Sequence, residues 1–239
     1  MKYPIKILYL GIDTIELHWP EIIAEDLLIE MITIKNLIQK KWHIIISSIY
    51  HSYQILSIRL KHVANSAVFM AWLEELIQGP IPKVDLPQRW IWTVPVCYEQ
   101  EIVPSISKYL EKKDMDVQTL VKQHSSQQYL LYFYGFLPGF MYLGGLPKVL
   151  HIPRKDIPDR NIAKGSVAIG GEQTGIYPID SPGGWYVVGK MPVPIFGNGK
   201  LNLPFNPGDK IQFEAISSRE LIEIQEASNY NWEKTLYRG

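Results

Sequence analysis

The stretch YLLYFYGFLPGFMYLGG, residues 129–145, decides how this sequence is interpreted. It begins with apolar and aromatic residues that are typical of a β-strand. It continues with aromatic residues alternating with glycine and proline, which set tight turns and close backbone approaches. On this segment alone we favour an aromatic-rich corner of a β-barrel. The alternative is a rigid loop that binds a small planar or anionic ligand through its rings and backbone amides.

The surrounding C-terminal sequence supports the barrel. Most glycines lie from Gly135 onward, and short β-branched or aromatic runs are separated by Gly and Pro. Two short helical patterns precede them, near residues 105–112 and 116–124. The expected strands are residues 129–133, 167–169, 185–188, 193–196 and 210–213. We therefore predict a mainly-β barrel domain over residues 90–226 and a loosely held tail over 227–239.

The N-terminal sequence has a different pattern. Apolar residues at 23, 27, 31, 34 and 38 predict a helix that opens at Pro20, and a second apolar stripe ends at Gly79. Strand-like runs at residues 5–10, 15–19, 44–49 and 53–60 accompany these helices. We expect an α+β domain over residues 1–80 with both helices on one side of a sheet. The proline-rich residues 81–89 are expected to be a linker.

Composition excludes several functional classes. Basic and acidic residues number 24 each, so the chain lacks the positive charge on which nucleic-acid and anionic-lipid binding depend. Cys97 is the single cysteine and the six histidines never fall at metal-ligand spacing, so we expect no disulfide and no metal site. No signal peptide or membrane-spanning run is present, and we expect a cytoplasmic protein.

Two later blocks carry polar groups that could orient an amide or carboxylate. Gln173, Thr174, Tyr177 and Ser181 stand in a frame of glycines, although the same glycines are also ordinary turn signals. Arg154 lies beside a proline, where it could clamp a carboxylate or simply be solvated. The sequence contains no Walker A motif, dinucleotide fingerprint or Gly-x-Ser-x-Gly elbow. From the residues alone, we predict a concave ligand site without an identifiable nucleophile.

Together, several motifs closely resemble the Kip-type kinase-inhibitor (KipI) family, also labelled allophanate hydrolase subunit 1 and the PxpB family of 5-oxoprolinase subunits. The resemblance is strong over about residues 94–214 and extends weakly to residues 50–52. The motifs are GFLPGF (135–140), YLGGL (142–146), GSV (165–167), QTGIYP (173–178) and SPGGW (181–185).

This resemblance implies an N-terminal α+β ferredoxin-like domain followed by a mainly-β cyclophilin-like barrel domain. It implies a subunit of an ATP-dependent 5-oxoprolinase, which converts 5-oxo-L-proline to L-glutamate and is inactive as a single chain. The implied partners are a companion subunit of the carboxyltransferase type (C-like) and a third subunit of the LamB/YcsF type. ATP with Mg²⁺ is implied for the complex, and none is indicated for this chain alone.

By position, the residues that match the family pattern are our candidate site, with roles unassigned. They are His124, Tyr134, Phe136, Pro138, Gly139, Tyr142, Arg154, Gln173, Thr174, Tyr177, Ser181 and Trp185. The sequence departs from the pattern where Glu99 follows the Cys-Tyr pair and where Lys164 precedes Gly165. It also has Asp159 after Pro158 where the family has a second arginine, so a clamp that needs this arginine is not expected.

The family resemblance leaves two alternatives to the enzyme subunit. One is a binding protein that docks on a sensor histidine kinase and inhibits it. The other is half of a biotin-dependent carboxyltransferase of the urea carboxylase or allophanate hydrolase type, which would require a biotinylated carrier.

Overall fold

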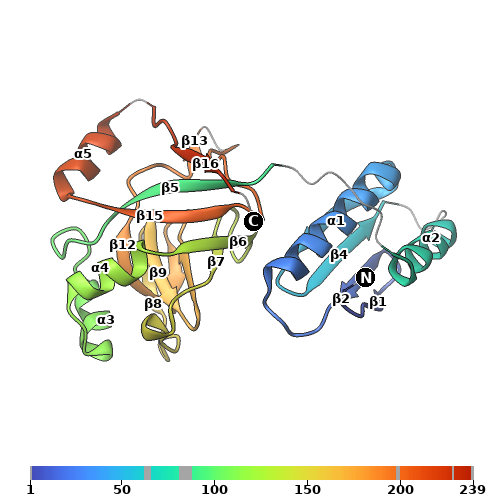
Figure 1. Cartoon of the computed structure of the whole chain (residues 1–239), viewed down its shortest axis with the longest axis horizontal. Coiled ribbons are helices and arrows are strands. Elements are labelled where there is room, and N and C mark those ends of the chain that lie inside the picture. The colour runs from blue at the N-terminus through green and yellow to red at the C-terminus, as the bar shows by residue number, and fades with distance from the viewer. Residues whose placement is uncertain (1, 62–65, 81–87, 198–199, 228, 238–239) are drawn as a thin grey trace. The chain divides into compact units, whose positions relative to one another are not determined.

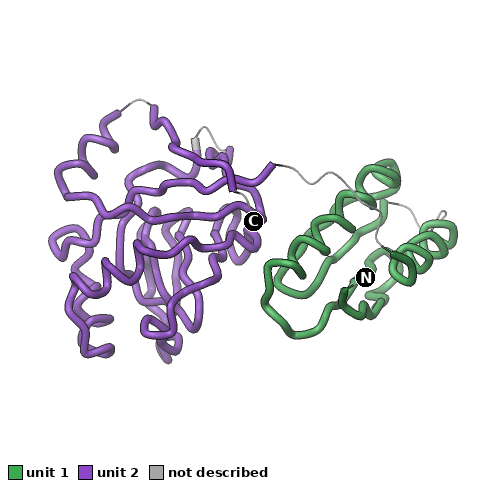
Figure 2. Tube along the Cα trace, viewed as in Figure 1, with its two compact units in different colours: residues 1–87 green, residues 88–239 purple. Residues whose placement is uncertain are grey.

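The computed structural model describes residues 2–61, 66–80, 88–197, 200–227 and 229–237. The chain divides into two compact units, residues 1–87 and 88–239 (Figure 2). The predicted linker at residues 81–89 falls almost entirely outside the described residues. Within the described ranges, no helix combines the length and apolar character that crossing a membrane requires.

The first unit is a four-stranded antiparallel sheet with two helices (Figure 1). Its spatial strand order is β1-β2-β4-β3. Ile15 and Leu17 of β2 and Leu56 and Ile58 of β4 are buried with both helices in one core, so both helices cover the same sheet face. In chain order the elements are β1 (Lys6–Leu10), β2 (Thr14–His18), α1 (Glu25–Trp42), β3 (Ile46–His51), β4 (Ile55–Leu60) and α2 (Ser66–Gln78).

Helix α1 begins later than its apolar pattern predicted. The strand pairing of β2 continues to Trp19, whose backbone N–H donates to the Gln54 carbonyl at 2.8 Å. Residues 20–24 then turn the chain onto the sheet face, and the helix starts at Glu25. Ile23, predicted to lie on the buried face, is 49% exposed. The sequence pattern located the helix and misplaced its first turn.

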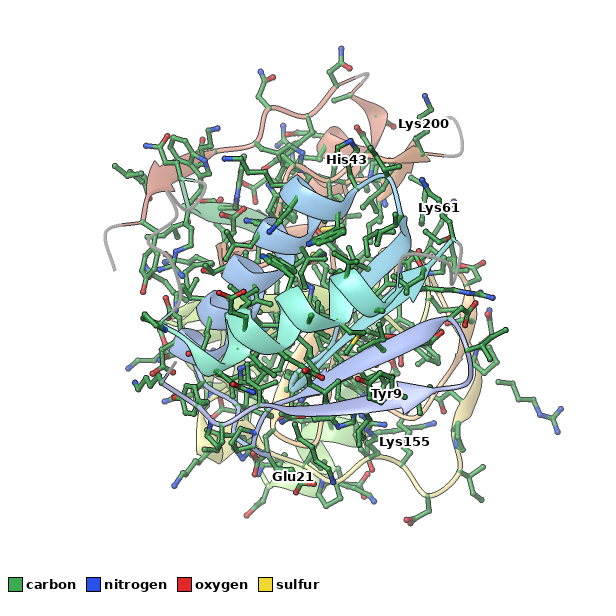
Figure 3. All side chains as sticks on the ribbon, turned by 90° about the vertical axis from the view of Figure 1, so that its right-hand side faces the viewer. Tyr9, Glu21, His43, Lys61, Lys155 and Lys200 are labelled. Carbon is green, nitrogen blue, oxygen red and sulfur yellow. The ribbon has the colours of Figure 1, made fainter. Side chains whose placement is uncertain are left out.

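The ferredoxin-like assignment of this unit is not confirmed. A ferredoxin-like domain follows the order βαββαβ, whereas the described elements of this unit follow ββαββα. Strand β1 pairs antiparallel with β2 at the edge of the sheet and carries Tyr9, which is 60% exposed (Figure 3). What the structure establishes is an α+β layer with helices on one face.

The second unit is built on a closed β-barrel of seven strands, which confirms the predicted barrel. The strands follow the order β12-β9-β10-β7-β6-β15-β5, and the pairing of Lys190 with Cys97 joins β12 to β5 and closes the ring. Its barrel strands are β5 (Trp90–Cys97), β6 (Gln128–Tyr134), β7 (Met141–Gly144), β9 (Ser166–Gly170), β10 (Gln173–Ile176), β12 (Tyr186–Lys190) and β15 (Lys210–Ile216). The other elements are α3 (Ile106–Lys113), α4 (Val117–Ser125), η2 (Lys148–Leu150), β8 (Asp159–Ile162), β11 (Ser181–Gly183), β13 (Phe196–Gly197), β14 (Lys200–Leu201), α5 (Ser218–Glu226) and β16 (Lys234–Leu236).

A buried carboxylate fixes the start of β5. Asp209 is 2% exposed and accepts hydrogen bonds from the Trp90 backbone N–H at 2.9 Å and from the Trp92 indole at 3.0 Å. It also accepts from the Asn206 backbone N–H at 2.8 Å. Because both of its oxygens are hydrogen-bonded, this buried carboxylate holds the turn before β15 against β5.

The C-terminal stretch is not the loosely held tail that its polar sequence suggested. Strand β16 pairs antiparallel with β5, with Lys234 opposite Trp92 and Leu236 opposite Trp90. The Lys234 ammonium lies 4.0 Å from the centroid of the Trp90 ring. Backbone pairing and this cation–π contact together anchor the segment on the barrel.

Candidate functional site

Aromatic rings from three separated segments meet on the barrel. Phe140 lies at their centre, with its ring centroid 4.9 Å from that of Tyr142, 5.0 Å from Tyr177 and 5.4 Å from Trp185. The Tyr142 and Trp185 rings are 6.0 Å apart and nearly perpendicular. Edge-to-face contacts of this kind stabilise a fixed arrangement of rings. We call Phe140, Tyr142, Tyr177 and Trp185 the aromatic cluster.

Glycines make room for two of these rings. A Cβ atom on Gly170 would lie 2.5 Å from the Trp185 ring, and one on Gly183 would lie 2.2 Å from the Tyr177 hydroxyl. No other residue type fits at such distances without displacing the ring. The glycines that are turn signals in the sequence therefore also shape the cluster.

Arg154 supplies the positive charge at the cluster. Its guanidinium lies 5.6 Å from the centroid of the Trp185 ring, within the range of a cation–π contact. The Arg154 side chain is exposed and makes no hydrogen bond or ion pair with another described residue. Its five donors thus remain available to an anionic ligand.

Arg154 also influences the two tyrosines of the cluster. Burial raises the pKa of Tyr142, and the nearby Arg154 guanidinium opposes that rise. Burial raises the pKa of Tyr177 to about 12, with hydrogen bonding from the Trp185 backbone and the Arg154 charge acting in the opposite direction. Both phenols are therefore neutral near pH 7, and Arg154 is close enough to lower the pKa of each.

His124 and Thr174 belong to a different, fully buried network. The His124 Nε2 lies 2.9 Å from the Thr174 Oγ1, and that hydroxyl donates to the Ala168 carbonyl at 3.1 Å. Nε2 must therefore carry the proton, which leaves Nδ1 to accept from the Tyr98 hydroxyl at 2.7 Å. The imidazole stacks on Phe213 with ring centroids 4.7 Å apart.

This burial determines what His124 can do. Both His124 and Thr174 are 0% exposed, and burial lowers the His124 pKa from 6.5 to about 3. A neutral imidazole with both nitrogens bonded inside the barrel has no position for a ligand. The geometry makes His124 and Thr174 packing residues of the core.

The loop before β7 is a tight turn whose amides are largely used within it. Gly135 donates to the Phe140 carbonyl at 3.1 Å, Leu137 donates to the Gly135 carbonyl at 2.7 Å and Phe140 donates to the Leu137 carbonyl at 3.0 Å. These three amides are thus not available for the anion-binding nest that the sequence suggested. The loop contributes shape to the site more than hydrogen-bond donors.

The candidate side chains of this loop point to different surroundings. The Tyr134 hydroxyl donates to the Phe205 carbonyl at 3.0 Å, away from the cluster, while Phe136 is 63% exposed and meets Phe140 edge-on at 5.7 Å. Pro138 is exposed, and Gly139 is buried with a positive φ of 86°. Of these four, Phe136 is the one in ring contact with the aromatic cluster.

The remaining candidates, Gln173 and Ser181, have no described hydrogen bond to the cluster. Gln173 is half-buried at the start of β10. Ser181 is 7% exposed, and its Oγ has no hydrogen-bond partner among the described residues. Phe140, at the centre of the cluster, lies in the predicted 135–140 motif but was not singled out as a candidate residue. The sequence contained one signal for it: Phe140 is two positions before Tyr142, and residues two apart in an extended segment lie on the same face.

Comparisons with known proteins match most of this chain to a family. Residues 5–204 match the family model of the carboxyltransferase domain, subdomain C and D. The B-type subunit of 5-oxoprolinase from Bacillus subtilis (strain 168) is 38% identical over 143 residues, which cover 59% of each chain. Its counterpart of the same name from Escherichia coli O157:H7 is 37% identical over 128 residues, covering 53% of this chain and 59% of the relative. This chain thus spans 59% of the length of both relatives.

Solved structures agree on the fold. A conserved uncharacterized protein from Pyrococcus horikoshii is 28% identical, with 90% of this chain and all of that chain covered and a TM-score of 0.51. The Kluyveromyces lactis urea amidolyase is 13% identical with a TM-score of 0.72, covering 98% of this chain and 16% of that chain. The second likeness shows a shared fold and carries no argument about activity.

Proposed function

We propose a function on the premise that this chain belongs to the family of carboxyltransferase domains, subdomain C and D, and is similar to the B-type subunits of 5-oxoprolinase. The chain is one subunit of an ATP-dependent 5-oxoprolinase that converts 5-oxo-L-proline to L-glutamate. It acts in a hetero-oligomer with a C-like companion subunit and a LamB/YcsF-type subunit, in the cytoplasm. The same proposal includes a cyclophilin-like fold for the barrel and leaves out the ferredoxin-like fold, because the described elements of the first unit follow a different order.

The observation that carries this proposal is the cation–π contact of Arg154 with Trp185, beside the buried Tyr177 and the half-buried Tyr142. 5-Oxoproline is a small, nearly flat lactam ring that bears one carboxylate. A guanidinium binds a carboxylate through two parallel hydrogen bonds, and aromatic rings cover the faces of a flat ring. Arg154 would take the carboxylate and the half-buried Tyr142 would meet the ring, while the buried Phe140, Tyr177 and Trp185 hold these two side chains in place.

On this chain, catalysis would consist of binding and orientation. The aromatic cluster offers no nucleophilic side chain, and its phenols stay protonated near pH 7. A neutral tyrosine can donate a hydrogen bond to the lactam oxygen while Arg154 holds the carboxylate. Holding a poorly reactive amide in one orientation lowers the entropic part of the barrier to its activation.

The donor set around Arg154 does not fit magnesium-bound ATP. Mg²⁺ prefers carboxylate oxygens, whereas the described groups at the cluster are one guanidinium and two phenols. The nearby Asp159 carboxylate is bonded to the Lys155 ammonium. We therefore assign ATP and Mg²⁺ to the complex as a whole and derive no step through them on this chain.

The test is calorimetric titration of 5-oxo-L-proline into the assembled complex without ATP. We expect Arg154→Gln to weaken binding at least tenfold, since it removes a charge-assisted carboxylate contact. Arg160→Gln is the matched control, because Arg160 is also exposed but lies on β8 outside the cluster, and it should bind within about twofold of the wild type.

A second ligand isolates the carboxylate contact. 2-Pyrrolidinone has the same lactam ring without the carboxylate, so the wild type and Arg154→Gln should bind it equally weakly. Equal affinity of both proteins for 5-oxoproline would refute the site assignment. It would leave inhibition of a sensor histidine kinase or a biotin-dependent carboxyltransferase as the functions to test next.

A further inference from the structure

A cavity of about 370 Å³ lies in the barrel unit. None of the four cluster residues lines it, and neither does Arg154. Its walls are apolar and include the rings of Pro178, Pro192, Pro194 and Phe196 and the side chain of Met191. Because proline has no backbone N–H, these walls present few hydrogen-bond donors. The volume is within the range of sites for small organic molecules.

The polar side of this cavity is cationic. Lys190, at the end of β12, and Lys164, just before β9, both line it, and Gln225 of α5 adds an amide. The Lys190 ammonium donates to the Lys164 carbonyl, which holds it close to Lys164. Lys164 itself is exposed, and its backbone N–H donates to the Asp180 carboxylate at 2.7 Å.

The charges of this lysine pair are incompletely compensated. Burial lowers the pKa of Lys190, the Asp180 carboxylate opposes that change and the Lys164 ammonium adds to it. Two ammonium groups thus repel each other near one carboxylate that is already engaged by a backbone amide. An anion placed between them would relieve this repulsion.

We propose that this cavity binds a small organic anion, a carboxylate carried on a compact aliphatic or alicyclic body, with Lys190 and Lys164 on the carboxylate and the proline-rich wall on the body. An inorganic anion would leave the apolar wall unused. A neutral apolar molecule would leave the repulsion between the two ammonium groups uncompensated. The proposal does not depend on the oxoprolinase assignment, because none of the residues that it uses belongs to the aromatic cluster and Arg154 is not among them.

Methyl NMR of the full-length chain tests this directly. The sequence has six methionines, and Met191 lines the cavity, so its ¹³C-labelled methyl group is a local reporter that Met191→Leu assigns. Cyclohexanecarboxylate is the probe, and cyclohexylmethanol is its uncharged counterpart. We expect the carboxylate to shift the Met191 signal saturably and the alcohol to bind at least tenfold more weakly.

Charge-removing variants complete the test. Lys190→Gln should weaken binding of the carboxylate about tenfold, and Lys164→Gln severalfold, while Lys108→Gln, an exposed lysine on α3, should match the wild type. Lys164→Gln changes an exposed side chain, so it decides the question if Lys190→Gln fails to fold. Equal binding of acid and alcohol, unchanged binding in the lysine variants, or no saturable shift would each overturn the proposal.

Discussion

Acidification should lower the free energy of unfolding of the barrel through His124, because burial keeps this imidazole neutral in the folded chain. The imidazole is 0% exposed and bonded at both nitrogens, and its pKa falls from 6.5 to about 3 in the folded chain. Between these two pKa values the unfolded chain binds a proton that the folded chain does not. The free energy of unfolding is therefore not reduced by His124 well above pH 6.5, and it falls as the pH decreases from 6.5 toward 3.

The size of the effect follows from the same two values. At about pH 5.5 the unfolded His124 is roughly nine-tenths protonated while the folded one is neutral, so this residue alone costs about 1.4 kcal/mol relative to about pH 7.5. At lower pH the loss approaches about 1.4 kcal/mol per pH unit. That is a measurable part of the roughly 5–15 kcal/mol that typically stabilises a domain.

Urea unfolding at several pH values measures this loss, with hydrogen-exchange protection of β10 and β15 as the readout for the barrel unit. His124→Gln keeps a donor and an acceptor but does not titrate. Between about pH 7.5 and about pH 5.5, this variant should therefore lose about 1.4 kcal/mol less stability than the wild type. Thr174→Val is the control: it loses the hydrogen bond to Nε2 and keeps the buried imidazole, so it should be less stable with the wild-type pH slope. A slope in His124→Gln as steep as in the wild type would refute the reasoning.

Two further substitutions test the barrel's construction. Gly139→Val should lower the free energy of unfolding by roughly 1–3 kcal/mol, because Gly139 has a φ of 86° and its Cβ would lie 2.9 Å from the Leu201 side chain; an unchanged urea midpoint would contradict this. Asp209→Ala should cost about 3 kcal/mol or more, because it leaves the buried Trp92 indole and two backbone amides without their acceptor. The exposed Asp156→Ala is its control in the same denaturation assay, and equal losses in both would refute the role of Asp209.

The sequence was most informative where local pattern and tertiary structure agree. Short runs bounded by glycine and proline, such as residues 129–145, predicted a β-barrel, and a seven-stranded closed barrel is what the structure has. The fold also brings together Tyr142 and Trp185, which two separate motifs had singled out. The glycines were recognised in the sequence as turn residues. That some of them also leave room for aromatic rings was not predicted, because only the folded chain shows which ring lies against each glycine.

The site was less predictable, because burial is a property of the whole fold. His124 and Thr174 match the family motif as well as Arg154 does, yet they lie inside the barrel while Arg154 is exposed. A linear motif cannot separate residues that are retained for packing from residues that meet a ligand. Likewise, helix α1 began at Glu25 because pairing of the preceding strand reached Trp19, a tertiary constraint that hydrophobic periodicity does not contain.

In our proposal, this chain orients 5-oxoproline as one subunit of an oxoprolinase. The most direct measurement is 5-oxoproline-dependent ATP hydrolysis with glutamate release, for the chain alone, with its companion subunit, and with all three subunits. We expect no turnover by the chain alone, glutamate release by the full mixture, and at least a tenfold loss of kcat/KM with Arg154→Gln in that mixture but not with Arg160→Gln. A folded, assembled three-subunit complex that releases no glutamate, or whose kcat/KM is unaffected by Arg154→Gln, would contradict the proposal.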